Sequence, residues 1–123
     1  MVYNDNVRWV WAIKMRREFV RTNTFERNWA DMGLNDENLR ELENVLLENP
    51  KTGSVVPHLS GARKIRYALQ GRGKSGGARV VYVDVVVRER IYFLMAYPKN
   101  VQTDLTPEQR ETLNKLIAVL KEE

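Results

Sequence analysis

The sequence predicts an α+β domain in which a small antiparallel β-sheet carries an N-terminal helical hairpin and a C-terminal helix. Three patterns predict this arrangement: apolar residues at helical spacing in residues 25–49, strand patterns in residues 62–99, and a capped amphipathic segment after residue 105. The chain of 123 residues is long enough for one domain with a single core. It contains no internal repeat, linker or low-complexity tract.

The N-terminal part predicts a short strand followed by two helices. Residues 17–22, REFVRT, alternate in polarity as a strand does. Thr24 is the expected N-cap of the first helix, and Asn35 or Asp36 that of the second. The apolar residues of the second helix recur at helical spacing and predict a core face: Leu39, Leu42, Val45, Leu46 and Leu47. Pro50 ends this helix because proline disfavours helical backbone in the residue before it.

The second half changes to strand patterns. Residues 62–69, ARKIRYAL, alternate basic and apolar side chains, and residues 78–87, ARVVYVDVVV, are rich in valine. Residues 89–99, ERIYFLMAYPK, form a third expected strand after a tight turn. The chain then closes with an amphipathic helix in which Thr106 is the N-cap and Pro107 the first helical residue.

Charge is distributed unevenly along the chain. The formal net charge is +4. Seven basic residues and no acidic residue lie between positions 51 and 83: Lys51, Arg63, Lys64, Arg66, Arg72, Lys74 and Arg79. The rest of the chain therefore carries a net charge of about −3, and this segment creates a local positive field suited to a polyanion.

Composition excludes several classes of protein. There is no cysteine, so neither a disulfide nor a thiolate metal site holds the fold. No apolar run approaches the roughly 18 residues that cross a bilayer, and the N-terminus does not read as a signal peptide. We therefore expect a cytoplasmic protein with no membrane partner.

The glycine-rich stretch QGRGKSGGARVVYV, residues 70–83, partly imitates a phosphate-binding loop. A nucleotide-binding P-loop would need glycine at position 68, where Ala68 stands, and a helix after the loop instead of a strand. A hairpin connection is the favoured interpretation, although it does not explain why the flanking strands are basic.

Three strings together resemble the RelE/ParE superfamily of type II toxins, most closely its HigB-like branch. They are LLENPKTG, LSGARKIRYALQGRGKSGGARVVYV and IYFLMAYPKNVQTDLTPEQRETLNKL, and the resemblance covers about residues 17–120. Residues 1–14 fall outside the family pattern and are expected to be an N-terminal extension to a single toxin domain over residues 15–123.

The resemblance implies a ribosome-dependent endoribonuclease that cuts mRNA and arrests translation, with a sheet and helices similar to those of microbial ribonucleases. It also implies a cognate helix-turn-helix antitoxin (HigA-like) that holds the toxin inactive, and operator DNA bound through that antitoxin. It implies neither a cofactor nor a metal.

RNA cleavage by the 2′-hydroxyl needs a base, stabilisation of the charge on the phosphorane, and an acid for the leaving 5′-oxygen. The single histidine, His58, lies in an expected loop, and the basic segment contains no carboxylate. Cationic side chains must then supply the electrostatic part, and a lysine crowded by other cations could serve as the base.

The resemblance assigns the catalytic positions residue by residue. Lys64 and Arg66 lie on one face of a strand and match the family's paired basic residues; Arg79 matches the arginine that opens the next strand and contacts the scissile phosphate. Tyr97 and Lys99 lie where the family has further catalytic or RNA-contacting groups. The C-terminal tyrosine of the RelE branch has no counterpart in KLIAVLKEE.

Three further cations, Arg63, Arg72 and Lys74, are expected to bind the RNA backbone. Two other classes stay open: a ParE-like gyrase inhibitor without nuclease activity, and a non-enzymatic nucleic-acid-binding module. The plainer interpretation of the basic strand is a solvated sheet face, and that of Tyr67, Tyr82 and Tyr92 is core packing.

Overall fold

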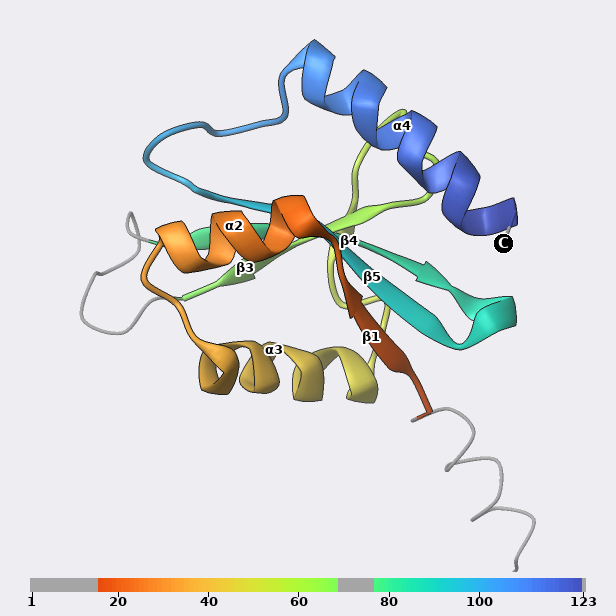
Figure 1. The fold of residues 1–123 in the computed structure, drawn as a ribbon, viewed down its shortest axis with the longest axis horizontal. Helices are drawn as coiled ribbons and strands as arrows, with labels where there is room; N and C mark the ends of the chain where they lie inside the picture. The colour runs from red at the N-terminus through yellow and green to blue at the C-terminus, as the bar shows by residue number, and fades with distance from the viewer. Residues whose placement is uncertain (1–15, 69–76, 123) are drawn as a thin grey trace, which may run out of the picture.

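The computed structural model describes residues 16–68 and 77–122 (Figure 1). In chain order the elements are β1 (Glu18–Arg21), α2 (Asn23–Asp31), α3 (Asp36–Glu48), β2 (Ser54–Val55), β3 (Arg63–Tyr67), β4 (Ala78–Val85), the 3-10 turn η2 (Val86–Arg88), β5 (Arg90–Pro98) and α4 (Pro107–Glu122). The predicted α+β fold, with a helical hairpin before the sheet and one helix after it, is confirmed. The extension expected at residues 1–14 lies outside the described residues.

The five strands form one sheet in the order β1-β5-β4-β3-β2. The pairs β2–β3, β3–β4 and β4–β5 are antiparallel, whereas β1 lies parallel to β5, from Glu18 beside Arg90 to Arg21 beside Phe93. The sheet is therefore mixed, and the expectation of a wholly antiparallel sheet is wrong at its first strand. The pattern of residues 17–22 predicts a strand but says nothing about a partner some 70 residues away in the chain.

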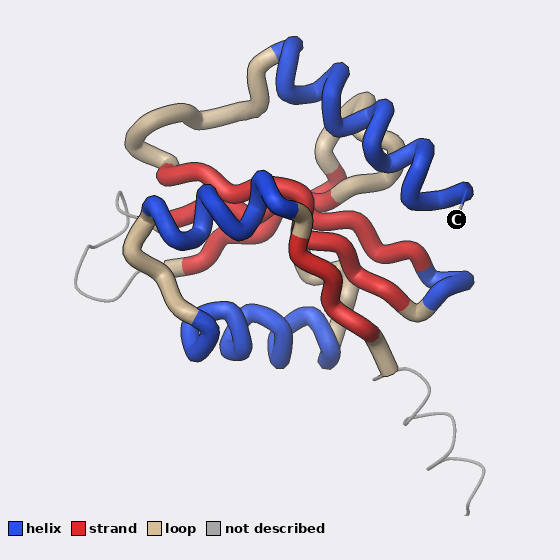
Figure 2. Tube along the Cα trace, viewed as in Figure 1, coloured by secondary structure: helices blue, strands red, loops and turns tan. Residues whose placement is uncertain are grey.

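The helices cover opposite faces of this sheet, which makes three layers (Figures 1 and 2). The α2–α3 hairpin packs on one face through a core that includes Phe25, Trp29 and Leu39 together with Tyr82 and Phe93. On the other face α4 contributes Leu113, Ile117 and Leu120, which join valines of β4 in a second core. Each side of the sheet thus has its own apolar core, and alternate residues of β4 serve the two.

Helix α2 begins one position after Thr22, so the expected cap at Thr24 is wrong. Thr22 has extended backbone, and its Oγ1 accepts a hydrogen bond from the Phe25 amide at 3.2 Å. The same hydroxyl reaches the Phe93 carbonyl at 3.0 Å, which ties the start of the helix to β5. This second contact is long-range, so the sequence near residue 22 gives no sign of it.

The other caps follow the sequence. Asn35 caps α3, and its side chain and that of Asn38 each accept from the other's backbone amide. Thr106 caps α4, since its Oγ1 accepts from the Gln109 amide at 3.1 Å while the Gln109 side chain accepts from the Thr106 amide. No helix in the described part of the chain is both long and apolar enough to span a bilayer.

Candidate active site

Three strands bring four of the five predicted catalytic residues together on the α4 face of the sheet, and three of the four form one row. In the register, Arg66 of β3 lies opposite Arg79 of β4, and Arg79 lies opposite Tyr97 of β5. Lys64 precedes Arg66 by two residues and therefore points to the same face, where it lies opposite Val81 of the α4-side core. Residues directly opposite each other have Cβ atoms about 5 Å apart, so this row presents two guanidinium groups and a phenol side by side.

Two polar groups of this row are buried without a partner. Tyr97 is only 3% exposed. Among the described residues, neither its hydroxyl nor Nη1 of Arg79 has a hydrogen-bond partner. Burial raises the pKa of Tyr97, and the nearby Asp104 carboxylate raises it further, while Arg79 lowers it. Unsatisfied buried polar groups each cost about 1–3 kcal/mol, so two neighbours on one face are a feature that stability alone does not favour.

Asp104 brings a carboxylate to this cationic surface. It lies in the connection between β5 and α4, and its Oδ1 is 3.8 Å from Nζ of Lys64 and 3.7 Å from Nη2 of Arg110. Sequence reasoning missed both partners, because each lies far from the basic segment in the chain. The only signal was the string DLT that follows the third strand in the family resemblance.

Arg110 also fixes α4 against the loop that precedes β3. Its Nη1 donates to the Pro57 carbonyl at 3.1 Å, while Asn114 donates to the carbonyl of His58. His58 has a left-handed φ of 60° and an exposed position, so the expectation that it is a loop residue is confirmed. Arg110 therefore connects this loop with Asp104, the carboxylate that lies near Lys64.

The other predicted residues divide into three cases. Arg63 lies on the opposite face, opposite Tyr82, and its Nη1 donates to the carbonyls of Gly53 at 2.8 Å and Lys51 at 3.2 Å. The structure therefore does not bring Arg63 into the row. Lys99 is half-buried in the turn after β5, where its backbone amide donates to the carbonyl of Gly77.

The remaining two predicted residues, Arg72 and Lys74, lie outside the described residues. Across residues 16–68 and 77–122 there is no group of three or more His, Cys, Asp or Glu side chains that could hold a metal ion.

The family model described as the RelE toxin of the RelE / RelB toxin-antitoxin system matches residues 17–122, which is most of the chain. The chain belongs to the RelE toxin family. The fold of this RelE-type toxin is similar to that of the E. coli toxin RelE, solved as a double arginine-to-alanine mutant in the free state. The TM-score is 0.54 at 16% identity, over 83% of this chain and 98% of that chain.

Family membership identifies the protein as a toxin of a type II toxin–antitoxin pair, and the shared fold accounts for the sheet that holds the row. It does not distinguish branches within the family, so the HigB-like assignment stays a prediction.

Proposed function

We propose that this RelE-family toxin is a ribosome-dependent endoribonuclease that cuts mRNA and arrests translation. One observation carries the proposal: Arg66, Arg79 and Tyr97 lie in register on one face, with Lys64 on the same face, and two buried polar groups of the row have no hydrogen-bond partner among the described residues. Cations on one face of neighbouring strands suit a phosphodiester, and a guanidinium nitrogen and a phenol without a partner in the described part of the chain suit the oxygens that gain charge or protons as it breaks.

In this proposal the 2′-hydroxyl of the RNA attacks the adjacent phosphorus. The new O2′–P bond forms as the P–O5′ bond breaks, which leaves a 2′,3′-cyclic phosphate and a free 5′-hydroxyl. Arg79 and Arg66 hold the non-bridging oxygens, and Tyr97 donates a proton to the leaving 5′-oxygen. Lys99, at the end of β5, extends RNA contact past the row.

The proton of the 2′-hydroxyl has two possible acceptors. One is a lysine crowded by other cations, and the lysine on this face is Lys64. The other is Asp104, whose carboxylate lies 3.8 Å from that lysine.

The test is expression in cells followed by mapping of RNA 5′ ends, with a parallel reaction on purified translating ribosomes. The wild-type chain should produce new 5′-hydroxyl ends within translated messages. Arg79→Ala and Lys64→Ala should each lower cutting by at least about 100-fold while the circular dichroism spectrum and melting transition stay close to those of the wild type. Lys51→Ala is the matched control, because this exposed lysine belongs to the basic segment but not to the row.

The same experiment separates the alternatives. DNA breaks without new RNA ends would identify a gyrase inhibitor, and neither product would identify a simple nucleic-acid-binding module. Cutting retained by both row variants at equal expression would refute the site.

We further propose that a cognate helix-turn-helix (HigA-like) antitoxin neutralises the toxin in the cytoplasm and carries the complex to operator DNA. Family membership supports an antitoxin partner. Co-purification with the protein encoded in the adjacent reading frame, followed by loss of cutting in its presence, checks this partner.

A further inference from the structure

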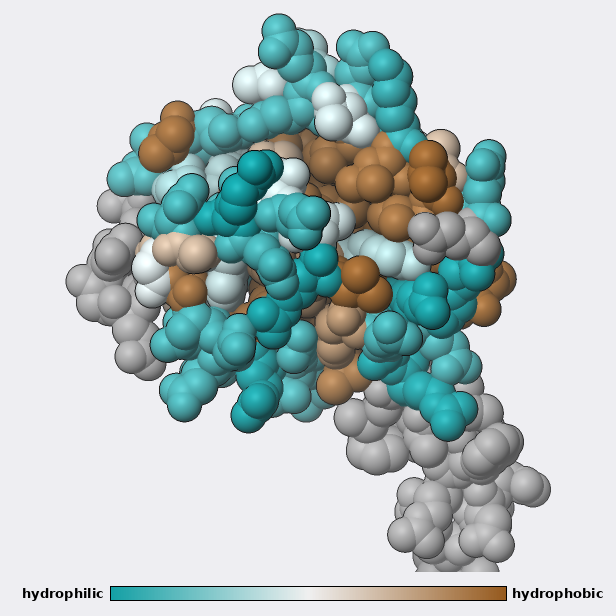
Figure 3. Space-filling model, viewed as in Figure 1, coloured by the Kyte–Doolittle hydropathy of each residue, from teal (hydrophilic) through white to brown (hydrophobic). Residues whose placement is uncertain are grey.

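Two adjoining hollows run along the open edge of β5, between α2 and α4. Because β1 pairs only with Arg90–Phe93, no strand among the described residues covers the edge of β5 from Leu94 to Pro98. The hollow toward Leu116 has a volume of about 370 Å³ and is called the outer hollow. The hollow toward Tyr97 has a volume of about 270 Å³ and is called the inner hollow. Both are lined by Asn28, Met95 and Gln109. Figure 3 shows apolar surface exposed beneath α4 on this side of the molecule.

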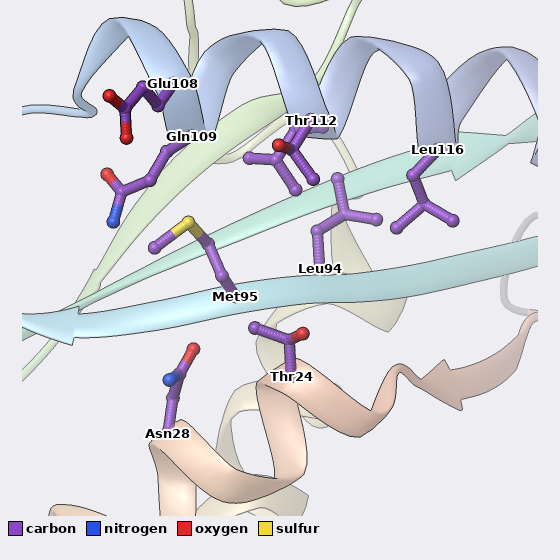
Figure 4. A pocket seen from close by; sticks show the side chains of 9 residues that line it. Thr24, Asn28, Leu94, Met95, Glu108, Gln109, Thr112 and Leu116 are labelled. Carbon is purple, nitrogen blue, oxygen red and sulfur yellow. The ribbon is translucent and has the colours of Figure 1, made fainter.

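The inner hollow adjoins the catalytic row, because Tyr97 lines it. Its walls carry three side-chain amides, from Asn28 of α2, Gln102 of the β5–α4 connection and Gln109 of α4. In Figure 4 the amides of Asn28 and Gln109 approach Met95 from the two helices on either side of β5. Amide groups therefore gather beside β5, the strand that carries Tyr97 and that pairs with the strand of Arg79.

Hydrogen bonds to the backbone fix how these amides are oriented. Asn28 Oδ1 accepts from the Ala96 amide at 3.1 Å, so its NH₂ group faces away from the strand. Gln109 Oε1 accepts from the Thr106 amide at 2.9 Å and from Nε2 of Gln102 at 3.0 Å. Gln102 also donates to the Asp104 carbonyl at 2.9 Å, and its Oε1 accepts from Nε2 of Gln109 at 3.5 Å. The hollow thus has amides held in fixed orientations, and the NH₂ group of Asn28 and the second N–H of Gln109 are its donors.

We propose that this inner hollow binds one nucleobase of the RNA next to the cleaved phosphate, and so sets the sequence preference of cutting. The inference rests on the proposed nuclease function. Side-chain amides pair with base edges through one donor and one acceptor, and single-stranded RNA presents its bases unstacked. Met32 and Met95 offer apolar surface to the faces of a flat ring. Asp31 on the rim disfavours the phosphate backbone there and can accept from an exocyclic amino group.

The chemistry of the two hollows differs, which favours a base over an apolar peptide side chain in the inner one. The apolar residues Leu113 and Leu116 line only the outer hollow. An apolar group in the inner hollow would cover amide donors without pairing them, at a cost that a base edge avoids.

The test uses variants that keep the structural acceptors and remove the donors. Gln109→Glu retains the oxygen that accepts from Thr106, and Asn28→Asp retains the oxygen that accepts from Ala96. Thr112→Val is the matched control, since Thr112 lies one turn after Gln109 and lines only the outer hollow. On ribosomes that translate a library of randomised codons, we expect the wild type and Thr112→Val to share one nucleotide preference beside the cut, and both amide variants to change it by about 5-fold or more.

A second arm does not depend on cutting: titration of the ¹⁵N-labelled wild-type chain with each of the four nucleoside 3′-monophosphates. The side-chain amide resonances of Asn28 and Gln109 should shift with at least one of them. Amide resonances that stay unmoved with all four, or a cutting preference identical in wild type and both amide variants, would overturn the base-binding hollow while the nuclease stands. A wild type that binds nucleotides at these amides yet cuts no message would instead overturn the nuclease.

Loss of antitoxin binding in Gln109→Glu with an unchanged cutting preference would assign the hollow to the protein partner, and would also overturn the proposal.

Discussion

Tyr97 is the residue at which stability and the proposed function conflict most directly. Its hydroxyl is buried and has no partner in the described part of the chain. Removing such a group relieves the desolvation cost without losing a hydrogen bond. We therefore expect Tyr97→Phe to leave the free energy of unfolding unchanged or to raise it by up to about 1 kcal/mol, and to lower RNA cutting by about 100-fold or more. Urea unfolding and ribosome cleavage assays check the two halves.

The reverse result, a destabilised Tyr97→Phe protein that cuts normally, would show that the hydroxyl has a structural partner and no part in the reaction. Tyr82→Phe is a useful contrast. The Tyr82 hydroxyl donates to the Pro50 carbonyl at 2.7 Å and accepts from the Gly53 amide at 3.0 Å. Its loss should destabilise the protein by about 1–3 kcal/mol.

The raised pKa of Tyr97 predicts how stability depends on pH. Burial is the main cause of the increase, and Asp104 adds to it. The folded protein keeps this proton to a higher pH than the unfolded chain, so stability that is present below pH about 10 is lost as the pH rises through the raised pKa. Tyr97→Phe should therefore lose less stability above this pH than the wild type. The remaining loss should come from Tyr67 and Tyr82, whose pKa values burial also raises.

Asp104→Asn tests the carboxylate that sequence reasoning missed. Without the negative charge the pKa of Tyr97 should fall relative to the wild type, which a ¹³C-tyrosine NMR titration would detect. If Asp104 takes the 2′-hydroxyl proton, this variant should also cut about 100-fold more slowly or worse. A variant that cuts as fast as the wild type would leave the base to Lys64.

The row of Arg66, Arg79 and Tyr97, with Lys64 beside it, was predictable because it depends on two local rules. Side chains two apart on a strand share a face, which groups Lys64 with Arg66, and the family strings locate Arg79 and Tyr97 on the next two strands. Asp104 and Arg110 depend instead on where the β5–α4 connection crosses the sheet. No periodicity in the sequence encodes that path, and a negative side chain is not what a search for cations would find.

At the scale of elements, the passage from α3 into β2 sets the position of β3. Gly53 lies so close to the sheet that an added Cβ would be 2.9 Å from both the Lys64 carbonyl oxygen and the Tyr82 ring. We expect Gly53→Ala to push β2 away from Lys64 and to destabilise the protein by about 1–3 kcal/mol. Chemical denaturation measures the loss, and reduced cutting at a temperature where the variant is folded would show that Lys64 has moved.

Gly33→Ala is the matched control for this prediction. Gly33 has a left-handed φ of 76°, but nothing lies within 4 Å of the place its Cβ would occupy. Alanine there should cost about 1 kcal/mol from backbone strain alone and should leave cutting unchanged. Equal loss of activity in both variants would mean that general destabilisation, and not the position of β3, explains the Gly53 result.

Elements were predictable where their signals are local. The caps at Asn35 and Thr106 each lie beside the residue that completes them three positions later, so a short window contains the whole motif. The cap at Thr22 is selected by its bond to β5, and the pairing of β1 with β5 joins segments that lie far apart in the chain. Strand β2 has only two residues, too few for any period to appear.

At the scale of the whole molecule, the α4 face of the sheet has an apolar core at one end and the row of polar and charged side chains at the other. The end of the sheet near η2 is filled by apolar side chains of β4, β5 and α4. The other end carries the row of Arg66, Arg79 and Tyr97. Composition alone showed that one segment of the chain is basic. The face of the sheet on which each basic side chain lies depends on the strand register, which places Arg63 on one face and its neighbours Lys64 and Arg66 on the other.

This separation predicts how binding to the ribosome depends on salt. A protein that neutralises phosphates releases counterions, so the logarithm of its affinity falls linearly with the logarithm of salt concentration, with a slope of about −0.7 per contact on single strands. If Lys64 and Arg79 each contact one phosphate, Lys64→Ala and Arg79→Ala should each make the slope shallower by about 0.7. Arg88→Ala, an exposed cation in η2 at the far end of the sheet, should leave it unchanged. Binding would be measured on ribosomes that hold mRNA with a 2′-deoxy substitution at the cut, so that no cleavage interferes. Equal slopes for all three variants would mean that the row does not touch RNA and that the positive field of the whole chain, not its arranged face, attracts the ribosome.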